Sequence, residues 1–175
     1  MKTNINLLQA ILIAAPPNSG KSVLAYLLSQ HLRDARMPHI LLRAAPDGEG
    51  DWFYESPDET RYLLRQKGEF SPRLVQAMRR AIERRALPML VDIGGLPRDD
   101  QFNWFDACTH VIHLYQEEDD RREWGQWLEA RSLILIAELH SQLQGPDTIL
   151  ASGGVLHGII SGLDREQPQP GSTFE

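Results

Sequence analysis

Short apolar runs alternate with longer amphipathic stretches along most of the chain. Six runs have the length of buried strands; they span residues 10–15, 39–44, 87–93, 110–115, 133–137 and 155–161. Five stretches between them carry apolar positions at helical spacing or helix-start signals; they are 20–35, 56–68, the stretch that begins at Ser71-Pro72, 98–107 and 117–131. Alternating strands and helices indicate a parallel sheet covered on both faces. The pattern predicts a three-layer α/β fold with a mostly parallel sheet of five strands or slightly more.

The chain of 175 residues has the length of one domain with a substantial core. We assign residues 1–165 to this domain. Residues 166–175 are rich in Gln, Pro, Gly and Ser, which predicts a disordered tail. Two segments stay ambiguous, because the run 133–137 also fits a helix and residues 142–150 give no clear signal.

The strongest chemical signal lies between the first strand and the first helix. Residues 15–22 read A-P-P-N-S-G-K-S, the phosphate-loop pattern G-x-x-x-x-G-K-[ST] with Ala15 in place of the first glycine. Because Ala15 precedes a proline, we expect extended backbone there, which alanine tolerates. The alternative is an ordinary turn before a helix. The pattern favours a P-loop NTPase fold over that alternative.

Such a loop aims backbone N–H groups and a helix dipole at one point, which suits the polyphosphate of a nucleotide. Lys21 is expected to reach the β- and γ-phosphates as a catalytic residue, and the Ser22 hydroxyl to coordinate Mg²⁺. The nucleotide-binding set that this predicts is Pro17, Asn18, Ser19, Gly20, Lys21, Ser22 and Val23.

A second motif supports the first. Asp92 ends an apolar strand, as in the Walker B arrangement, where an aspartate beside the phosphate loop helps to hold Mg²⁺. The predicted metal ligands are therefore Ser22 and Asp92. Residues 92–95 read D-I-G-G, an Asp-x-x-Gly pattern typical of the kinase–GTPase branch, and no glutamate follows Asp92. Since the guanine-reading Asn-Lys-x-Asp signature is missing, ATP is the expected nucleotide. Taken alone, Asp92 fits a turn residue at the end of a strand better.

An acidic loop follows the second strand. Residues 47–51 read D-G-E-G-D, and ligands of parallel sheets bind at the carboxyl ends of the strands. Asp47 or Asp51 is therefore a candidate base that accepts a proton from a hydroxyl acceptor. A simple acidic turn is the open alternative. Glu138 and His140, which we expect just after the fifth strand, are weaker candidates for contacts with the nucleobase of a bound nucleotide.

Residues 90–98, L-V-D-I-G-G-L-P-R, resemble the Asp-Gly-Phe-Pro-Arg segment of nucleoside monophosphate kinases with two extra residues. That resemblance implies that Arg98 contacts a substrate phosphate. It also places the helix at 117–131 where these kinases have a lid, so Arg121, Arg122 and Arg131 are candidates to neutralise charge on the transferred phosphoryl group. Solvated surface arginines are the alternative for each.

Composition narrows the setting. A net charge of −6 disfavours nonspecific nucleic-acid binding, although local basic patches remain an option. One cysteine, Cys108, excludes an intrachain disulfide and suits a reducing compartment. No apolar run is long enough to span a membrane, and the N-terminus does not have the pattern of a signal peptide. We therefore expect a cytoplasmic protein without a membrane partner.

Several segments together resemble one family: the phosphate loop, the run R-A-A-P-D-G-E-G-D-W at 43–52, residues 90–95, C-T-H at 108–110 and I-I-S-G-L at 159–163. They are similar to the AAA-like P-loop domain fused to, or encoded beside, the ring nucleases of type III CRISPR systems. The resemblance implies a nucleotide-binding accessory in antiviral defence with a ring-nuclease partner. It does not give this chain the cleavage of cyclic oligoadenylate, because nothing in these residues supplies the nuclease.

Two functions follow as hypotheses. The first is an Mg²⁺- and ATP-dependent phosphotransferase or NTPase of the kinase-like type, acting on a small nucleotide or RNA acceptor. The second is a slow or non-catalytic module that binds a nucleotide and regulates a nuclease partner. Both leave open whether copies of the chain associate with one another.

Overall fold

The computed structural model describes residues 8–44, 71–93 and 102–164. Seven strands lie within these ranges: β1 (Ala10–Ala14), β2 (Ile40–Ala44), β3 (Met89–Ile93), β4 (His110–Tyr115), β5 (Ile134–Gln142), β6 (Thr148–Ala151) and β7 (Leu156–Ser161). Four helices accompany them: α1 (Lys21–Asp34), α4 (Pro72–Glu83), α5 (Phe102–Phe105) and α6 (Glu118–Glu129). The predicted acidic loop at 46–52, the helix at 56–68, the start of the helix at 98–107 and the tail at 166–175 lie outside the described residues.

The strands form one sheet in the order β2-β3-β1-β4-β5-β7-β6. All neighbouring pairs are parallel except β6 and β7, which pair antiparallel at one edge. The predicted three-layer α/β fold with a mostly parallel sheet is confirmed. Strand β6 comes from the segment that gave no clear signal, because its Ile149 and Leu150 lie exposed on an edge strand and carry no burial pattern.

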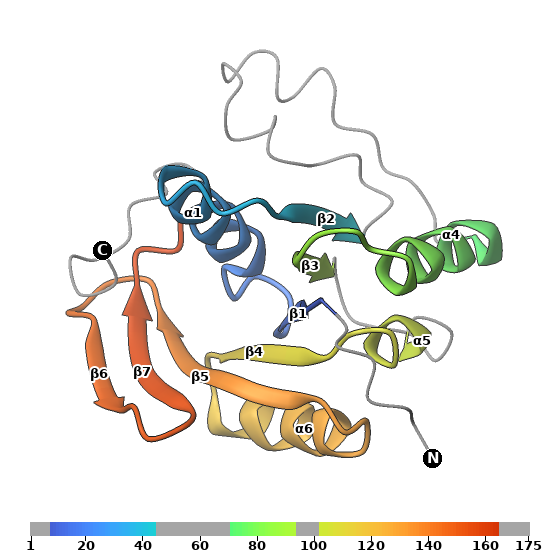
Figure 1. The fold of residues 1–175 in the computed structure, drawn as a ribbon. Coiled ribbons are helices and arrows are strands. Elements are labelled where there is room, and N and C mark those ends of the chain that lie inside the picture. Colours follow the sequence, from blue (N-terminus) through green and yellow to red (C-terminus); the bar gives the residue numbers. More distant parts are fainter. Residues whose placement is uncertain (1–7, 45–70, 94–101, 165–175) are drawn as a thin grey trace, which may run out of the picture.

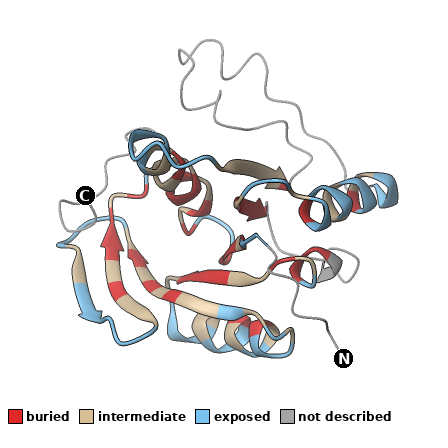
Figure 2. Ribbon diagram, viewed as in Figure 1, coloured by how far each residue is buried: buried red, intermediate tan, exposed pale blue. Residues whose placement is uncertain are grey.

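Helices cover both faces of the sheet, with α1 on one face and α4, α5 and α6 on the other (Figure 1). Side chains alternate along each strand, so every central strand contributes to two cores. In β4, Val111 packs with the core on the α6 side and Ile112 with the core on the α1 side. Burial is accordingly concentrated in the central strands and the inner helix faces (Figure 2).

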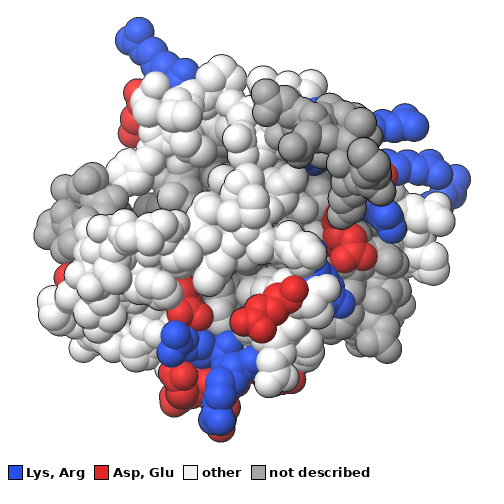
Figure 3. Space-filling model, turned by 60° about the horizontal axis from the view of Figure 1, so that its bottom comes forward, with Lys and Arg blue, Asp and Glu red and all other residues white. Residues whose placement is uncertain are grey.

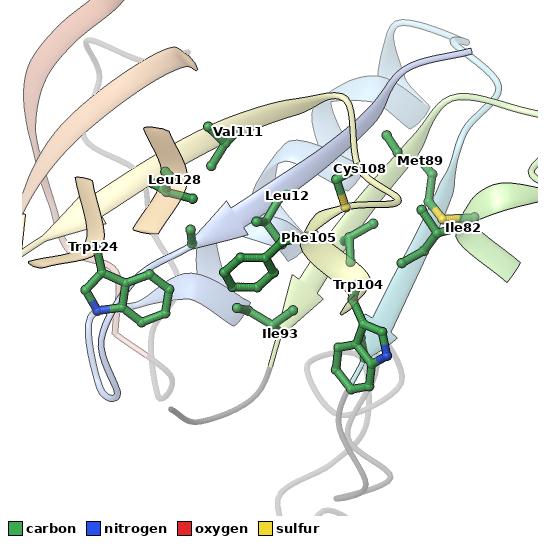
Figure 4. Packing of buried hydrophobic residues seen from close by; sticks show 14 of the residues in the cluster. Leu12, Ile82, Met89, Ile93, Trp104, Phe105, Cys108, Val111, Trp124 and Leu128 are labelled. Carbon is green, nitrogen blue, oxygen red and sulfur yellow. The ribbon is translucent and has the colours of Figure 1, made fainter. Parts of the chain in front are cut away.

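Three aromatic side chains, Trp104, Phe105 and Trp124, lie among aliphatic ones in the larger core (Figure 4). Phe105 and Trp124 are buried, and their ring centroids lie 6.5 Å apart. The indole N–H of Trp104 donates to the Val75 carbonyl at 2.9 Å, which ties α5 to α4. A buried indole needs such a partner. These contacts fix the helices on the sheet face opposite α1.

Local signals account for two helix starts. Ser71 caps α4, since its hydroxyl accepts from the Leu74 amide at 3.2 Å and Pro72 occupies the first turn, as predicted. Helix α6 begins with acids that suit the helix dipole.

Strand β5 corrects the sequence analysis. It runs to Gln142 and contains Glu138 and His140, which we expected after the strand. The apolar run stops at Ala137 because polar residues then alternate with Leu139 and Ser141, both buried. The segment 133–137 is thus the first half of a longer strand, and the helical alternative is excluded.

No helix in the described part of the chain is long and apolar enough to cross a membrane.

Candidate functional site

The loop between β1 and α1 lies at the carboxyl end of β1, an inner strand of the sheet (Figure 1). Its turn uses left-handed backbone at Asn18 (φ 64°) and Gly20 (φ 85°). Asparagine and glycine are the residues that adopt this region most readily. Ala15 is buried and is not in the left-handed region. The glycine that the motif has at this position is therefore unnecessary here, as we expected.

The first turn of α1 presents donors rather than acceptors. Gly20 is the N-cap, no side chain caps the helix, and no acid occurs in the first turn. The first intrahelical bond runs from the Leu24 amide to the Gly20 carbonyl at 2.9 Å. By helix geometry the amides of Lys21, Ser22 and Val23 have no acceptor within the helix. Together with the dipole, they favour an anion at this end.

Lys21 is buried and folds back over the loop. Its Nζ donates to the carbonyls of Ala15 at 3.0 Å and Pro16 at 2.7 Å. The Ser19 hydroxyl donates to the same Pro16 carbonyl. The ammonium group is thus held next to the helix N-terminus. A phosphate bound there would offer it charged oxygen acceptors in place of the neutral carbonyls. Hydrogen bonds between charged groups are roughly twice as strong as neutral ones.

Asp92 stands beside this loop because β3 is the direct neighbour of β1. The register pairs Asp92 with Ile13 of β1 on one side and with Arg43 of β2 on the other. One nitrogen of the Arg43 guanidinium donates both to Ser22 Oγ and to Asp92 Oδ2. Asp92 is buried, and within the described residues its Oδ1 has no hydrogen-bond partner. Ser22 and Asp92, predicted to act together, therefore meet at one cation.

The donor set suits Mg²⁺. This ion prefers oxygen ligands, usually one or two from the protein together with phosphate and water. Ser22 Oγ, Asp92 Oδ2 and the buried Asp92 Oδ1 supply oxygens beside the expected phosphate position. No cluster of three or more His, Cys, Asp or Glu side chains within residues 8–44, 71–93 and 102–164 could hold a metal by itself. A metal at this site would thus depend on a bound nucleotide for its remaining ligands.

The arginines predicted on the lid helix separate into two groups. Arg121 and Arg122 lie in the first turns of α6, at the carboxyl ends of the strands; Arg121 binds Glu138 at 2.8 Å, and Arg122 binds Asp119. Arg131 follows the end of α6, where it donates to the Trp127 carbonyl and lies 5.6 Å from the centre of the Phe105 ring. Because α6 runs back to the amino end of β5, Arg131 lies at the amino ends of the strands, whereas the phosphate loop lies at their carboxyl ends. The structure does not bring Arg131 to the site.

Glu138 is the centre of a polar row on the α6 face. The strand register places it between His113 of β4 and His157 of β7, with nitrogens 3.6 and 3.3 Å from its carboxylate. Burial lowers the pKa of His113 despite the nearby Glu138 charge. Burial alone would raise the pKa of Glu138, but the hydrogen bond and charge of Arg121, with the two histidines, bring it below its ordinary value. Glu138 is thus an ionised anchor for Arg121 rather than a proton acceptor near neutral pH.

Charges of both signs occur on the described surface, and α4 with its C-cap exposes Arg73, Arg80 and Arg84. Side chains of both signs lie next to one another on the lower part of the face in Figure 3. On α4, Arg79 pairs with Glu83 at 2.8 Å, and Arg85 donates to the carbonyls of Leu8 and Ile82. A nucleic-acid site needs cations available to phosphates. The arginines with these partners, Arg79 and Arg85, are therefore less available for that role than the exposed ones.

Two residues that the sequence analysis did not select belong to the site. Arg43 joins the two metal-ligand candidates, and its only signal was a charge at the end of an apolar strand. Leu163 packs on Gly20, where an added Cβ would lie 2.5 Å from the Leu163 Cβ. Asp47, Asp51 and Arg98, our candidates for the base and the substrate contact, fall outside the described residues.

No protein-family model and no curated protein matches the chain. Among solved structures, it is similar to chloroplast FtsY from Physcomitrella patens, with 13% sequence identity and a TM-score of 0.47. The match covers 81% of this chain and 52% of the FtsY chain, so the chain spans about half of that protein's length. At this level the likeness adds nothing on function, and the P-loop fold class rests on the chain's own β1, loop and α1. The resemblance to the ring-nuclease-associated domain stays a prediction.

Proposed function

We propose that this chain binds ATP with Mg²⁺ and transfers or releases its terminal phosphoryl group, as a kinase-like phosphotransferase or NTPase. One observation carries the proposal: the buried ammonium of Lys21, the uncapped N-terminus of α1 and the Ser22–Asp92 pair converge at the carboxyl end of β1. Phosphoryl transfer needs such positioning and charge neutralisation more than covalent chemistry. A role beside a ring nuclease in type III CRISPR defence is supported by the sequence resemblance alone.

In this proposal each residue has one task. The amides of the first turn of α1 and the Lys21 ammonium hold the phosphate oxygens. Ser22 and Asp92 would hold the metal ion, which when bound neutralises charge on the phosphates. Asp47 or Asp51 is the proposed base toward the acceptor, and Arg98 or Arg121 the proposed phosphate contact, with Arg122 as a weaker candidate.

The rival function is a nucleotide-dependent regulatory module with slow or no turnover. The observation that favours it is the Arg43 guanidinium, which already occupies both metal-ligand side chains. A site held in this way binds a nucleotide without assembling the metal centre needed for fast transfer.

The test combines binding and turnover. A fluorescent ATP analogue is titrated against the chain, and γ-labelled ATP with Mg²⁺ is incubated with nucleoside and RNA acceptors. Loss of the Lys21 ammonium removes charged hydrogen bonds of about 1.5–3 kcal/mol, so Lys21→Ala should weaken binding about 10- to 100-fold. The exposed Arg80→Ala, on α4, is the control for lost positive charge and should bind as the native chain does.

The outcomes separate the hypotheses. Label transfer that Lys21→Ala and Asp47→Ala both abolish supports the phosphotransferase. Binding without turnover on any acceptor supports the regulatory module. Lys21→Ala binding ATP as tightly as the native chain would refute both, because the loop would then not be the phosphate site.

A further inference from the structure

Arg43 occupies the position from which a metal ion would contact both Ser22 and Asp92. A single guanidinium nitrogen donates to Ser22 Oγ and to Asp92 Oδ2, the two oxygens that the sequence motifs assign to Mg²⁺. We propose that Arg43 is an internal cation that exchanges with the divalent metal: it holds these two side chains in the nucleotide-free site and moves to the phosphates when the metal enters. This inference rests on the proposed function.

The contact follows from the sheet itself. Arg43 and Asp92 are register partners in the parallel pair β2–β3, so their side chains lie on the same face, next to each other. The side chains are 13% and 3% exposed, respectively. A poorly hydrated pair interacts more strongly than a surface pair and is less screened by salt. Arg43 is therefore part of the buried site rather than a surface side chain that happens to reach it.

The charges make the two cations alternatives. Asp92 provides one negative charge, which the guanidinium neutralises. A divalent ion bound to the same carboxylate and to Ser22 would meet a like charge within contact distance, which disfavours simultaneous occupation. The unpartnered Asp92 Oδ1 offers the carboxylate's second oxygen to the entering ion. Replacement of the guanidinium by the metal ion, rather than binding of both, avoids placing two positive charges against the single charge of Asp92.

Displaced Arg43 would lie beside the nucleotide. A guanidinium binds phosphate oxygens bidentately and remains charged at any physiological pH. Without metal, Arg43 stays on Ser22 and Asp92 and supplies positive charge beside the phosphates, so the native site should bind a nucleotide with only a modest gain from Mg²⁺. A neutral residue at 43 should convert the site to strict metal dependence, since nothing then competes for Ser22 and Asp92 or replaces the ion.

The experiment measures metal binding directly. Mn²⁺ replaces Mg²⁺, and its free concentration is followed by electron paramagnetic resonance with and without a non-hydrolysable ATP analogue. We expect Arg43→Gln to bind Mn²⁺ about tenfold more tightly than the native chain when the nucleotide is present, or about 1.4 kcal/mol. Arg43→Lys keeps the charge but has a shorter side chain and no planar guanidinium, so its Mn²⁺ affinity should lie between the two. Arg80→Gln removes an exposed charge from α4 and should change nothing.

A second measurement separates this inference from the proposed function. A fluorescent ATP analogue is titrated in EDTA and in Mg²⁺, and thermal melting confirms that each variant is folded. The ratio of the two affinities should rise about tenfold in Arg43→Gln. If the native chain binds the analogue but Mn²⁺ affinity is unchanged or weaker in both Arg43 variants, the exchange is wrong and the binding function stands. If the native chain binds no analogue in either buffer, the proposed function itself fails.

Discussion

Replacing Gly20 with alanine tests whether the phosphate loop depends on a close contact with Leu163, which is distant along the chain but adjacent in space. Gly20 has φ 85°, and a Cβ there would lie 2.5 Å from the Cβ of Leu163 and 2.9 Å from its Cδ1. Leu163 is buried at the end of the described chain. The substitution therefore introduces backbone strain and a steric clash at the same position.

The expected cost is the sum of these two effects. A left-handed conformation costs a residue with a Cβ roughly 1–2 kcal/mol. Forcing an extra carbon into a packed contact typically costs about 1–3 kcal/mol. Gly20→Ala should thus lower the free energy of unfolding by about 2–5 kcal/mol, a large part of the roughly 5–15 kcal/mol that stabilises a typical domain.

Urea denaturation followed by tryptophan fluorescence gives the measurement. Gly125→Ala is the matched control, because Gly125 lies within α6 with nothing within 4 Å of its added Cβ. It should be neutral or stabilising by up to about 1 kcal/mol. A Leu163→Gly background removes both clashing side-chain atoms, Cβ and Cδ1, so adding Gly20→Ala there should cost chiefly the backbone strain, about 1–2 kcal/mol. A loss below about 0.5 kcal/mol for Gly20→Ala alone would refute the contact.

Three further predictions concern the core and the polar row. Burial holds the pKa of His113 below its ordinary value, so at mildly acidic pH this histidine binds a proton in the unfolded chain but not in the folded one. The free energy of unfolding should therefore fall as pH drops below about 6.5, and His113→Gln should flatten that part of its pH dependence. Burial raises the pKa of Cys108 to about 12, so a thiol reagent at pH 8 should modify the native chain slowly and the urea-unfolded chain at once; equal rates would contradict this burial. Trp104→Phe removes the indole donor to the Val75 carbonyl, which keeps its backbone donor within α4, and should cost about 0.5–1.5 kcal/mol in the same urea assay.

The architecture was predictable because periodicity and motifs are local. Five of the seven strands, the first half of β5 and the starts of α1 and α4 follow directly from apolar runs, caps and the loop pattern. Edge strand β6 was not predictable, since an exposed antiparallel edge has no buried face to impose a pattern. The second half of β5 was missed for a related reason: its polar residues face a row of partners on β4 and β7 that only the register reveals.

The candidate site shows the same division. The phosphate loop and Asp92 were found as motifs, but their spatial relation depends on β3 lying next to β1, which the sequence leaves open. Arg131 was assigned to the site because it belongs to the predicted lid helix. The direction of α6 instead carries it to the amino ends of the strands, away from the phosphate loop. Spacing along the chain identifies residue types suited to a reaction, whereas strand order and helix direction decide which of them meet.

Substitutions outside the sequence motifs are therefore expected to affect the nucleotide site. Arg43 and Leu163 contact residues of the site but lie in no nucleotide-binding motif: Arg43 reaches Asp92, 49 positions away along the chain, and Leu163 reaches Gly20, 143 positions away. Leu163→Ala should weaken binding of the fluorescent ATP analogue, because it removes the outer atoms of the side chain that packs on Gly20, while leaving every motif residue in place. Binding unchanged in a folded Leu163→Ala chain would mean that the loop keeps its shape by its own hydrogen bonds, chiefly those of Lys21 and Ser19. The comparison thus decides whether the nucleotide site is a local motif or a property of the whole sheet.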